Sequence, residues 1–254
     1  MRVWFLFVFV LLFVIPSTVY SFEPIPITLS HTMDEVIFDG KWTHKSEWKA
    51  SSLNTYIYDD DTQIILRSAH QDNFVYIHLN PITDHSVDLL EDHAVICFDT
   101  KNNKSAYADD DDYCFMAVLA GGSIVYKGSN IDEFEEISIP EGFIGAGSVS
   151  DHNDRYTSIP HPSYEFRIPT DIIGRENVYG FFFLVYDANL QKFYTYPQNL
   201  SVDDFVPSPN TWGEIYSPDK SLPEFDWPLA SLILSFGIIM ILARLKHRFF
   251  QETI

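Results

Sequence analysis

The chain has 254 residues and a formal net charge of −20 at pH 7, because 36 aspartate and glutamate residues outnumber 16 lysine and arginine residues. This charge excludes nucleic acid and anionic lipid surfaces as partners, since both are themselves anionic. The length of residues 22–226 lies within the range of one all-β domain. This segment has 12 basic and 35 acidic residues, and its negative charge favours divalent cations or cationic partners.

The beginning of the chain is apolar. Arg2 is followed by an almost unbroken apolar run at 3–15 and then by Pro16 and small or polar residues. One positive charge, a short apolar segment and a polar exit are typical of a secretory signal peptide, which we place at residues 1–21.

A second apolar run occupies residues 227–243, and a basic cluster at 244–248 follows it directly. This pattern predicts a transmembrane helix at 227–245 and a cytoplasmic basic tail at 246–254. The alternative is a buried C-terminal core helix. The first interpretation predicts a single-pass protein of the cell membrane, with its bulk outside the cell.

Short apolar runs with turn residues between them recur along residues 22–206. They predict strands at 36–38, 62–70, 73–80, 94–100, 113–120, 123–127, 142–150, 163–169, 179–188 and 192–196. One or two helical turns are expected at 41–50, an acidic loop at 131–136 and a brief turn or helix at 171–174. The fold class that follows is all-β, an antiparallel β-sandwich of about ten strands, and a Pro-rich irregular stalk is expected at 207–226.

The run at 73–80 alternates between an aliphatic and an aromatic face. Phe74, Tyr76 and His78 make up the aromatic face. Two interpretations stay open for it: a platform that faces a ligand, or a further layer of core.

Two cysteines, Cys97 and Cys114, lie one in each run of the central hairpin at 94–120. Antiparallel pairing can place their side chains opposite each other, and an exported chain favours a disulfide. The alternative is a pair of buried free thiols.

Two acidic runs are candidate calcium ligands. Asp109, Asp110, Asp111 and Asp112 end the hairpin loop, and Asp59 and Asp61 belong to the run at 59–61. Carboxylates with nearby carbonyl groups suit Ca²⁺. Four adjacent carboxylates repel one another, so without a cation some of their pKa values should rise. The alternative is a solvated acidic loop.

Four short motifs resemble the carbohydrate-binding module family 9-like fold, a relative of DOMON domains. They are DG, W and EW within 39–48, NFVYIHL at 73–79, EDHAVICFD at 91–99 and YEFRIP at 164–169. The resemblance implies a β-sandwich that binds sugars and, in some members, calcium or haem. Candidate ligand-binding residues are Phe74, Tyr76, His78, Tyr107 and Trp212, and haem would need His78 or His93 with Met116.

Pro223, Glu224 and Phe225, followed by the apolar run and the basic cluster, are similar to the PEF-type sorting signals of archaeal surface proteins. That resemblance implies a processing enzyme of the archaeosortase type as a partner. Permanent anchoring by the helix is the alternative.

No catalytic motif such as G-x-S-x-G or H-E-x-x-H occurs in the sequence. The leading hypothesis is a non-enzymatic, membrane-anchored cell-surface module that binds glycan, with calcium as a further ligand. The alternative is a structural or interaction component of the cell envelope or of a membrane complex without a small ligand. A haem-binding electron-transfer domain is the third hypothesis.

Overall fold

The computed structural model describes residues 24–28, 33–129, 133–198, 200, 202 and 206–217. The expected signal peptide, transmembrane helix and basic tail lie outside these residues, as do Pro223, Glu224 and Phe225. Within the described part of the chain, no helix is long and apolar enough to cross a membrane.

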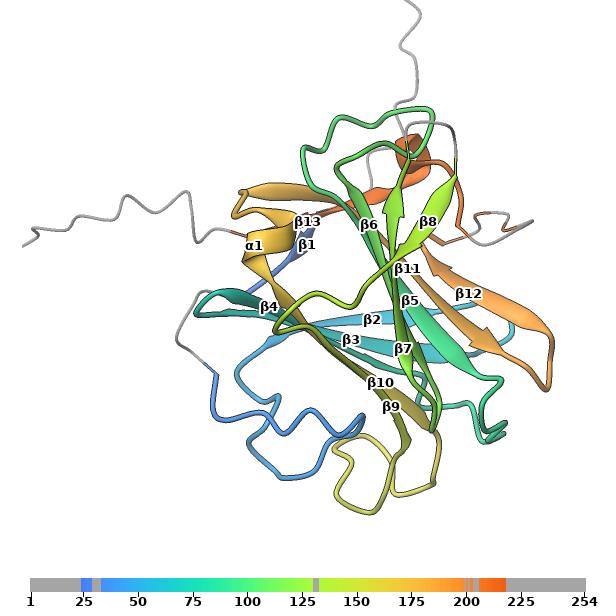
Figure 1. Cartoon of the computed structure of the whole chain (residues 1–254). Helices are drawn as coiled ribbons and strands as arrows, with labels where there is room; N and C mark the ends of the chain where they lie inside the picture. The colour runs from blue at the N-terminus through green and yellow to red at the C-terminus, as the bar shows by residue number, and fades with distance from the viewer. Residues whose placement is uncertain are drawn as a thin grey trace, which may run out of the picture.

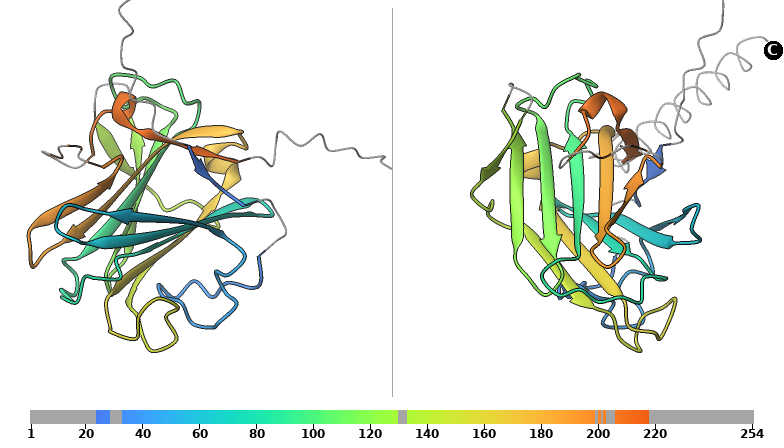
Figure 2. Two further views of the ribbon diagram at one scale, coloured as in Figure 1. Left: turned by 180° about the vertical axis from the view of Figure 1, so that it is seen from behind. Right: turned by 90° about the vertical axis from the view of Figure 1, so that its right-hand side faces the viewer.

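Two β-sheets packed face to face form the domain, which confirms the predicted all-β sandwich (Figures 1 and 2). Sheet A has eight strands in the order β1-β13-β11-β5-β6-β7-β8, with β12 also paired to β11. Its strands are β1 (Ile25–Pro26), β5 (His93–Asp99), β6 (Asp112–Val118), β7 (Ser123–Gly128), β8 (Phe134–Ile137), β11 (Val178–Asp187), β12 (Lys192–Tyr196) and β13 (Gly213–Tyr216).

Sheet B has five strands in the order β2-β3-β4-β10-β9. They are β2 (Ser52–Ile57), β3 (Gln63–Gln71), β4 (Phe74–Asn80), β9 (Ile144–Val149) and β10 (Pro162–Pro169). A single helical turn, α1 (Thr170–Ile173), follows β10, and a short 3-10 turn, η1 (Pro209–Thr211), precedes β13. The pairing of named strands is antiparallel except between β1 and β13.

Apolar side chains form three layers rather than one. The main core lies between the sheets, a second cluster covers the outer face of sheet A, and a third covers the outer face of sheet B. Strand β11 explains the second layer: Phe181 and Phe183 join the main core, while Phe182 and Leu184 join the outer cluster. A strand that is apolar on both faces is therefore covered on both, as its sequence predicts.

Three predicted segments differ in the structure. Residues 36–38 form no strand, because the Glu47 carboxylate, 2.7 Å from the Ile37 nitrogen, accepts that N–H in place of a neighbouring strand. Part of the expected acidic loop at 131–136 is the strand β8, whose exposed Glu135 and Glu136 suit the edge of a sheet.

The third difference concerns the expected stalk. Its first part belongs to the domain, because Pro209 starts η1 and β13 pairs with β11. Prolines interrupt strands, but the four residues of β13 contain none. Strand β2 was not predicted, because its alternating sequence SLNTYI has few apolar residues and lies at a sheet edge.

Candidate functional site

The outer face of sheet B is covered by the segment before β2. The ring of Trp48 stacks on that of His78, with centroids 5.2 Å apart, and the Trp48 indole donates a hydrogen bond of 2.8 Å to Glu165. The other oxygen of Glu165 accepts the N–H of Gly40, also at 2.8 Å. A buried carboxylate on β10 thus holds both ends of the cover.

Gly40 is required at this turn for two reasons. Its φ of +88° is unfavourable for other residues, and a Cβ added there would lie 2.7 Å from the backbone nitrogen of Ser148. The Asp39-Gly40 motif therefore lets the covering segment approach β9. Glu47 completes the cover by accepting the N–H of Thr43 at 2.6 Å.

At His78 the aromatic face of β4 is consequently a layer of core, the second of the two interpretations that the sequence leaves open. His78 has 0% exposure, and its Nε2 lies 2.9 Å from the Ser163 hydroxyl. Burial lowers the pKa of His78 to about 3, and His161 and Arg67 add to this effect. The imidazole is therefore neutral, and the cover separates it from solvent.

Phe74 and Tyr76 are half-buried on the same face. The guanidinium of Arg167 lies 4.8 Å from the centroid of Phe74, and Phe38 makes an edge contact with Tyr76 at 4.8 Å. Each ring thus already has a protein partner on this face.

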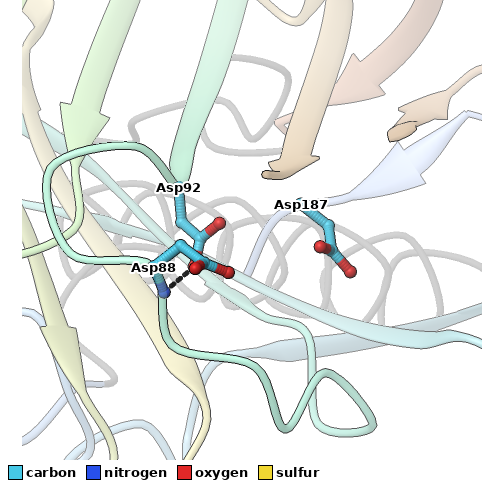
Figure 3. Close-up of side chains that lie close together, drawn as sticks. All are labelled: Asp88, Asp92 and Asp187. Atoms are coloured by element: carbon cyan, nitrogen blue, oxygen red, sulfur yellow. Dashed lines mark hydrogen bonds between the residues drawn. The ribbon is translucent and has the colours of Figure 1, made fainter. Parts of the chain in front are cut away.

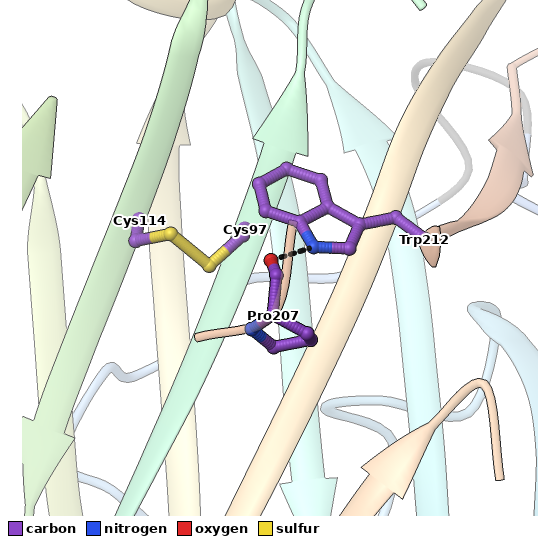
Figure 4. Close-up of a disulfide and its surroundings, with 4 residues drawn as sticks. All are labelled: Cys97, Cys114, Pro207 and Trp212. Carbon is purple, nitrogen blue, oxygen red and sulfur yellow. Dashed lines mark hydrogen bonds between the residues drawn. A yellow bond between two sulfur atoms is a disulfide. The ribbon is translucent and has the colours of Figure 1, made fainter. Parts of the chain in front are cut away.

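Cys97 and Cys114 form the predicted disulfide (Figure 4). They are directly opposed in the β5–β6 pairing and lie on the outer face of sheet A. Trp212 belongs to the same cluster, has 2% exposure and donates from its indole nitrogen to the Pro207 carbonyl at 2.8 Å. Trp212 therefore covers the disulfide and offers no open surface.

The hairpin loop between β5 and β6 places Asp109, Asp110 and Asp111 together. The ammonium of Lys101 lies 2.9 Å from Asp111, and the Asn103 amide donates to Asp109 at 3.0 Å. Part of the negative charge in this loop is thus already balanced by the protein.

Asp112 differs from its neighbours because it is fully buried and one of its oxygens has no hydrogen-bond partner among the described residues. Burial raises the pKa of Asp112 to about 7, and the negative charges of Asp99, Asp109 and Asp111 contribute to this rise. The hydrogen bond from the Asp109 N–H has the opposite effect on this pKa. Burial also raises the pKa of Asp111, whereas the pKa of Asp109 is lowered, because its hydrogen bonds outweigh the effect of burial. The expected rise thus occurs at two of the adjacent carboxylates, with burial as its main cause.

The run at 59–61 lies elsewhere, in the turn between β2 and β3. Asp60 accepts hydrogen bonds from Lys192 and from the Tyr194 hydroxyl of β12. The group of three carboxylates in the hairpin loop includes neither Asp59 nor Asp61. The structure therefore does not bring the two acidic runs together.

Of the two histidines considered for haem together with Met116, only His78 is far from it. His78 belongs to the outer face of sheet B, whereas Met116 packs on the outer cluster of sheet A, so the whole sandwich lies between them. His93 lies on the same outer face of sheet A as Met116, because it precedes Val95, the pairing partner of Met116, by two residues. Its ring is 5.0 Å from that of Tyr186.

A pocket of about 460 Å³ opens where β5 ends and β11 begins. Five of the six residues that line it are polar: Thr100, Lys101, Asn102, Glu176 and Asn177, with Val178 as the sixth. The side-chain carbonyl oxygens of Asn102 and Asn177 are buried without a hydrogen-bond partner among the described residues. Such acceptors suit a ligand rich in hydroxyl groups, because a buried unsatisfied acceptor costs roughly 1–3 kcal/mol.

Sequence reasoning missed Asn102 and Asn177, because they are far apart in the chain and belong to no motif. Tyr107, which it did select, lies in the hairpin loop that supplies Asn102 and is 62% exposed. The left-handed backbone of Asn102, with φ of +50°, is typical of asparagine in tight turns, but this signal does not identify a binding site.

No family model and no curated protein matches the sequence of this chain. Its fold is similar to that of a family 9 carbohydrate-binding module from Caldicellulosiruptor kristjanssonii in complex with cellotriose. The TM-score is 0.52 at 15% identity, and the match covers 80% of this chain and 97% of that one. A family 9 module of the same organism in complex with glucose matches with a TM-score of 0.46 at 14% identity, over 75% of this chain and 95% of that one.

Proposed function

We propose that this chain is a carbohydrate-binding module without catalytic activity. The observation that carries the proposal is the shared β-sandwich, which spans 97% of a family 9 module that was solved with cellotriose. The short motifs that resemble this family lie in β4, β5, β10 and the cover on sheet B, which are parts of that fold.

The pocket between β5 and β11 is the proposed sugar site. Sugar hydroxyl groups both donate and accept hydrogen bonds, and the pocket offers them the amides of Asn102 and Asn177 and the carboxylate of Glu176. Its volume of about 460 Å³ lies in the range of small-molecule sites. Tyr107 is the exposed aromatic residue of the adjoining loop.

This site differs from a tryptophan sandwich. Trp42, Trp48 and Trp212, the tryptophans among the described residues, are all buried. Affinity would therefore depend on hydrogen bonds and on Tyr107, and we expect weak binding of a short oligosaccharide.

Calorimetric titration with cellotriose and with other oligosaccharides tests the proposal. The pocket variants are Asn177→Ala and Asn102→Gly, since glycine keeps the left-handed backbone at 102. Each should weaken binding about fivefold, the effect of one lost hydrogen bond of about 1 kcal/mol. Asn153→Ala, at an exposed site in another loop, is the matched control and should bind like the wild type.

Two results would contradict this proposal in different ways. Equal binding by the wild type and both pocket variants would show that the sugar site lies elsewhere. No binding to any glycan of a broad array would favour the alternative, an interaction component of the cell envelope or of a membrane complex.

Calcium at the hairpin loop remains part of the proposal. The donors would be Asp109, Asp110 and Asp111, one oxygen of each lying within 4.8 Å of the others, with the unpartnered oxygen of Asp112 nearby in sequence. Location at the cell surface, with anchoring in the membrane, rests on the sequence patterns at the two ends of the chain.

A further inference from the structure

Figure 3 shows a second group of carboxylates. The pairing of β5 with β11 places it at the opposite end of sheet A from the pocket. Asp92 immediately precedes β5, Asp187 ends β11, and Asp88 belongs to the loop that leads into β5. One carboxylate oxygen from each of the three lies within 4.8 Å of the others. Asp92 and Asp187 are buried, and Asp88 is half-buried.

Hydrogen bonds hold two of these carboxylates in place without neutralising them. Asp92 accepts the N–H groups of Asp88 and Ala188, both at 2.9 Å, and Asp187 accepts that of Leu190 at 2.8 Å. No lysine, arginine or histidine of the described residues forms an ion pair with any of the three. Three carboxylates thus meet in a partly desolvated place, and no positively charged side chain of the described residues is paired with them.

Asp84, from the same loop, adds to the negative field. Burial raises its pKa to about 6, and the nearby charges of Asp187 and Asp92 act in the same direction. Burial likewise raises the pKa of Asp92, with Asp88 and Asp187 contributing.

Tyr164 supplies an independent sign of a ligand. This residue of β10, in the opposite sheet, has 0% exposure, and its hydroxyl has no hydrogen-bond partner among the described residues. Tyr164 pairs with Gly147 of β9, and Gly147 forms a β-bridge with Leu119. The N–H of Leu119 in turn donates to the Asp92 carbonyl at 2.8 Å, so Tyr164 lies near the cluster. Buried hydroxyl groups nearly always have a partner, so this one points to an ion or to water held by an ion.

We propose that Asp88, Asp92 and Asp187 bind a Ca²⁺ ion, with Tyr164 donating to a carboxylate or to a water molecule of the coordination shell. Calcium–oxygen bonds of 2.3–2.6 Å allow ligand oxygens to lie up to about 5 Å apart, which fits the cluster. The ion would connect the loop before β5 to the turn after β11. It would thus stabilise one end of sheet A, and its binding does not require a sugar.

Calcium titration of the purified protein tests this proposal, read by melting temperature and by calorimetry. The informative variant combines Asp88→Asn with Asp187→Asn, because neither substitution breaks a hydrogen bond among the described residues. Asparagine at 187 can still accept the Leu190 N–H, and the Asp88 side chain accepts no hydrogen bond in the described structure. In millimolar Ca²⁺ the wild type should melt at a higher temperature than without it. The double variant should lose most of this shift and bind Ca²⁺ at least tenfold more weakly.

Without calcium, the same variant should melt at a higher temperature than the wild type, because two repelling charges are gone. A merely structural role for these aspartates would instead lower its melting temperature. A terbium ion bound at this site should emit on excitation of tyrosine, and Tyr164→Phe should reduce that emission while leaving the protein folded.

The matched control is Asp109→Asn with Asp111→Asn, which removes two charges from the hairpin loop instead. This variant should keep the part of the calcium response that belongs to the Asp88 cluster, and any part that it loses belongs to the hairpin loop. An equal calcium shift in the wild type and in the Asp88/Asp187 variant would overturn the proposal. So would an equal shift by NaCl at the same ionic strength, which would indicate screening alone.

Discussion

Single residues show that the environment of a carboxylate decides its role. Glu165 is fully buried, and burial raises its pKa well above the usual range, while the bonds from Trp48 and Gly40 oppose that rise. Its two oxygens each accept one donor from the cover, so its role is structural. Asp92 also accepts two N–H groups, but it shares its place with the carboxylates of Asp88 and Asp187, and this arrangement of three carboxylates suits a cation.

Replacing Glu165 tests its structural role. In Glu165→Gln the amide NH₂ must face either the Trp48 indole N–H or the Gly40 N–H, and both of these are donors. One donor then stays unpaired in a buried place, and we expect a loss of about 1–3 kcal/mol in the free energy of unfolding.

Denaturant unfolding of the variant measures this loss. Glu141→Gln, at an exposed position, is the control and should have the stability of the wild type. If Glu165→Gln is as stable as Glu141→Gln, then Glu165 does not hold the cover on sheet B.

At the scale of elements, the β5–β6 hairpin is the part on which the proposed sugar site depends. Its register places Cys97 opposite Cys114 and Asp99 opposite Asp112. The strands therefore bring the disulfide close to the loop that carries Asn102, Tyr107 and the aspartates. Trp212 covers the disulfide from the outer side and connects the hairpin to β13.

Removing the disulfide should destabilise this hairpin. A cross-link between residues separated by 17 positions restricts the unfolded chain by about 3 kcal/mol in the loop-entropy model. Cys97→Ala and Cys114→Ala should each lower the melting temperature of the oxidised protein, and the double variant should be little worse than either single one.

Thermal unfolding of oxidised and reduced wild type provides the comparison, because reduction breaks the bond without creating a cavity. Reduced wild type should melt close to the single variants. Two reactive thiols in the denatured, unreduced protein would show that the bond does not form in solution.

For the whole molecule, the antiparallel sandwich separates two polar groups of residues. Strands β5 and β11 are paired along their length. The pocket lies at one end of this pair, and the Asp88 cluster lies at the other. The strong negative charge of the chain is compatible with cations at either end and with an uncharged sugar in the pocket.

The proposed location at the cell surface concerns the molecule as a whole. The Arg2 signal segment and the basic cluster after residue 243 predict that residues 22–226 lie outside the cell. A protease added to intact cells should therefore degrade this region, while a cytoplasmic marker protein stays intact. Full protection of the region would rule out the extracellular location.

The sequence by itself determined the sandwich, most of its strands and the disulfide. The alternation of aliphatic and aromatic residues in β4 and the apolar residues on both faces of β11 are local signals. Successive side chains of a strand point to opposite faces, so these patterns directly predict which faces are buried. The two cysteines lie on neighbouring strands of one hairpin, so their pairing also needs only local information.

Tertiary structure alone decided what covers each face and which polar groups meet. His78 and Trp212 look like ligand platforms in the sequence, and they are buried because distant segments fold over them. Asn102 with Asn177, and Asp88 with Asp187, come together only through the pairing of β5 with β11. No local pattern encodes such contacts, because residues so far apart in the chain become neighbours only when the sheet forms.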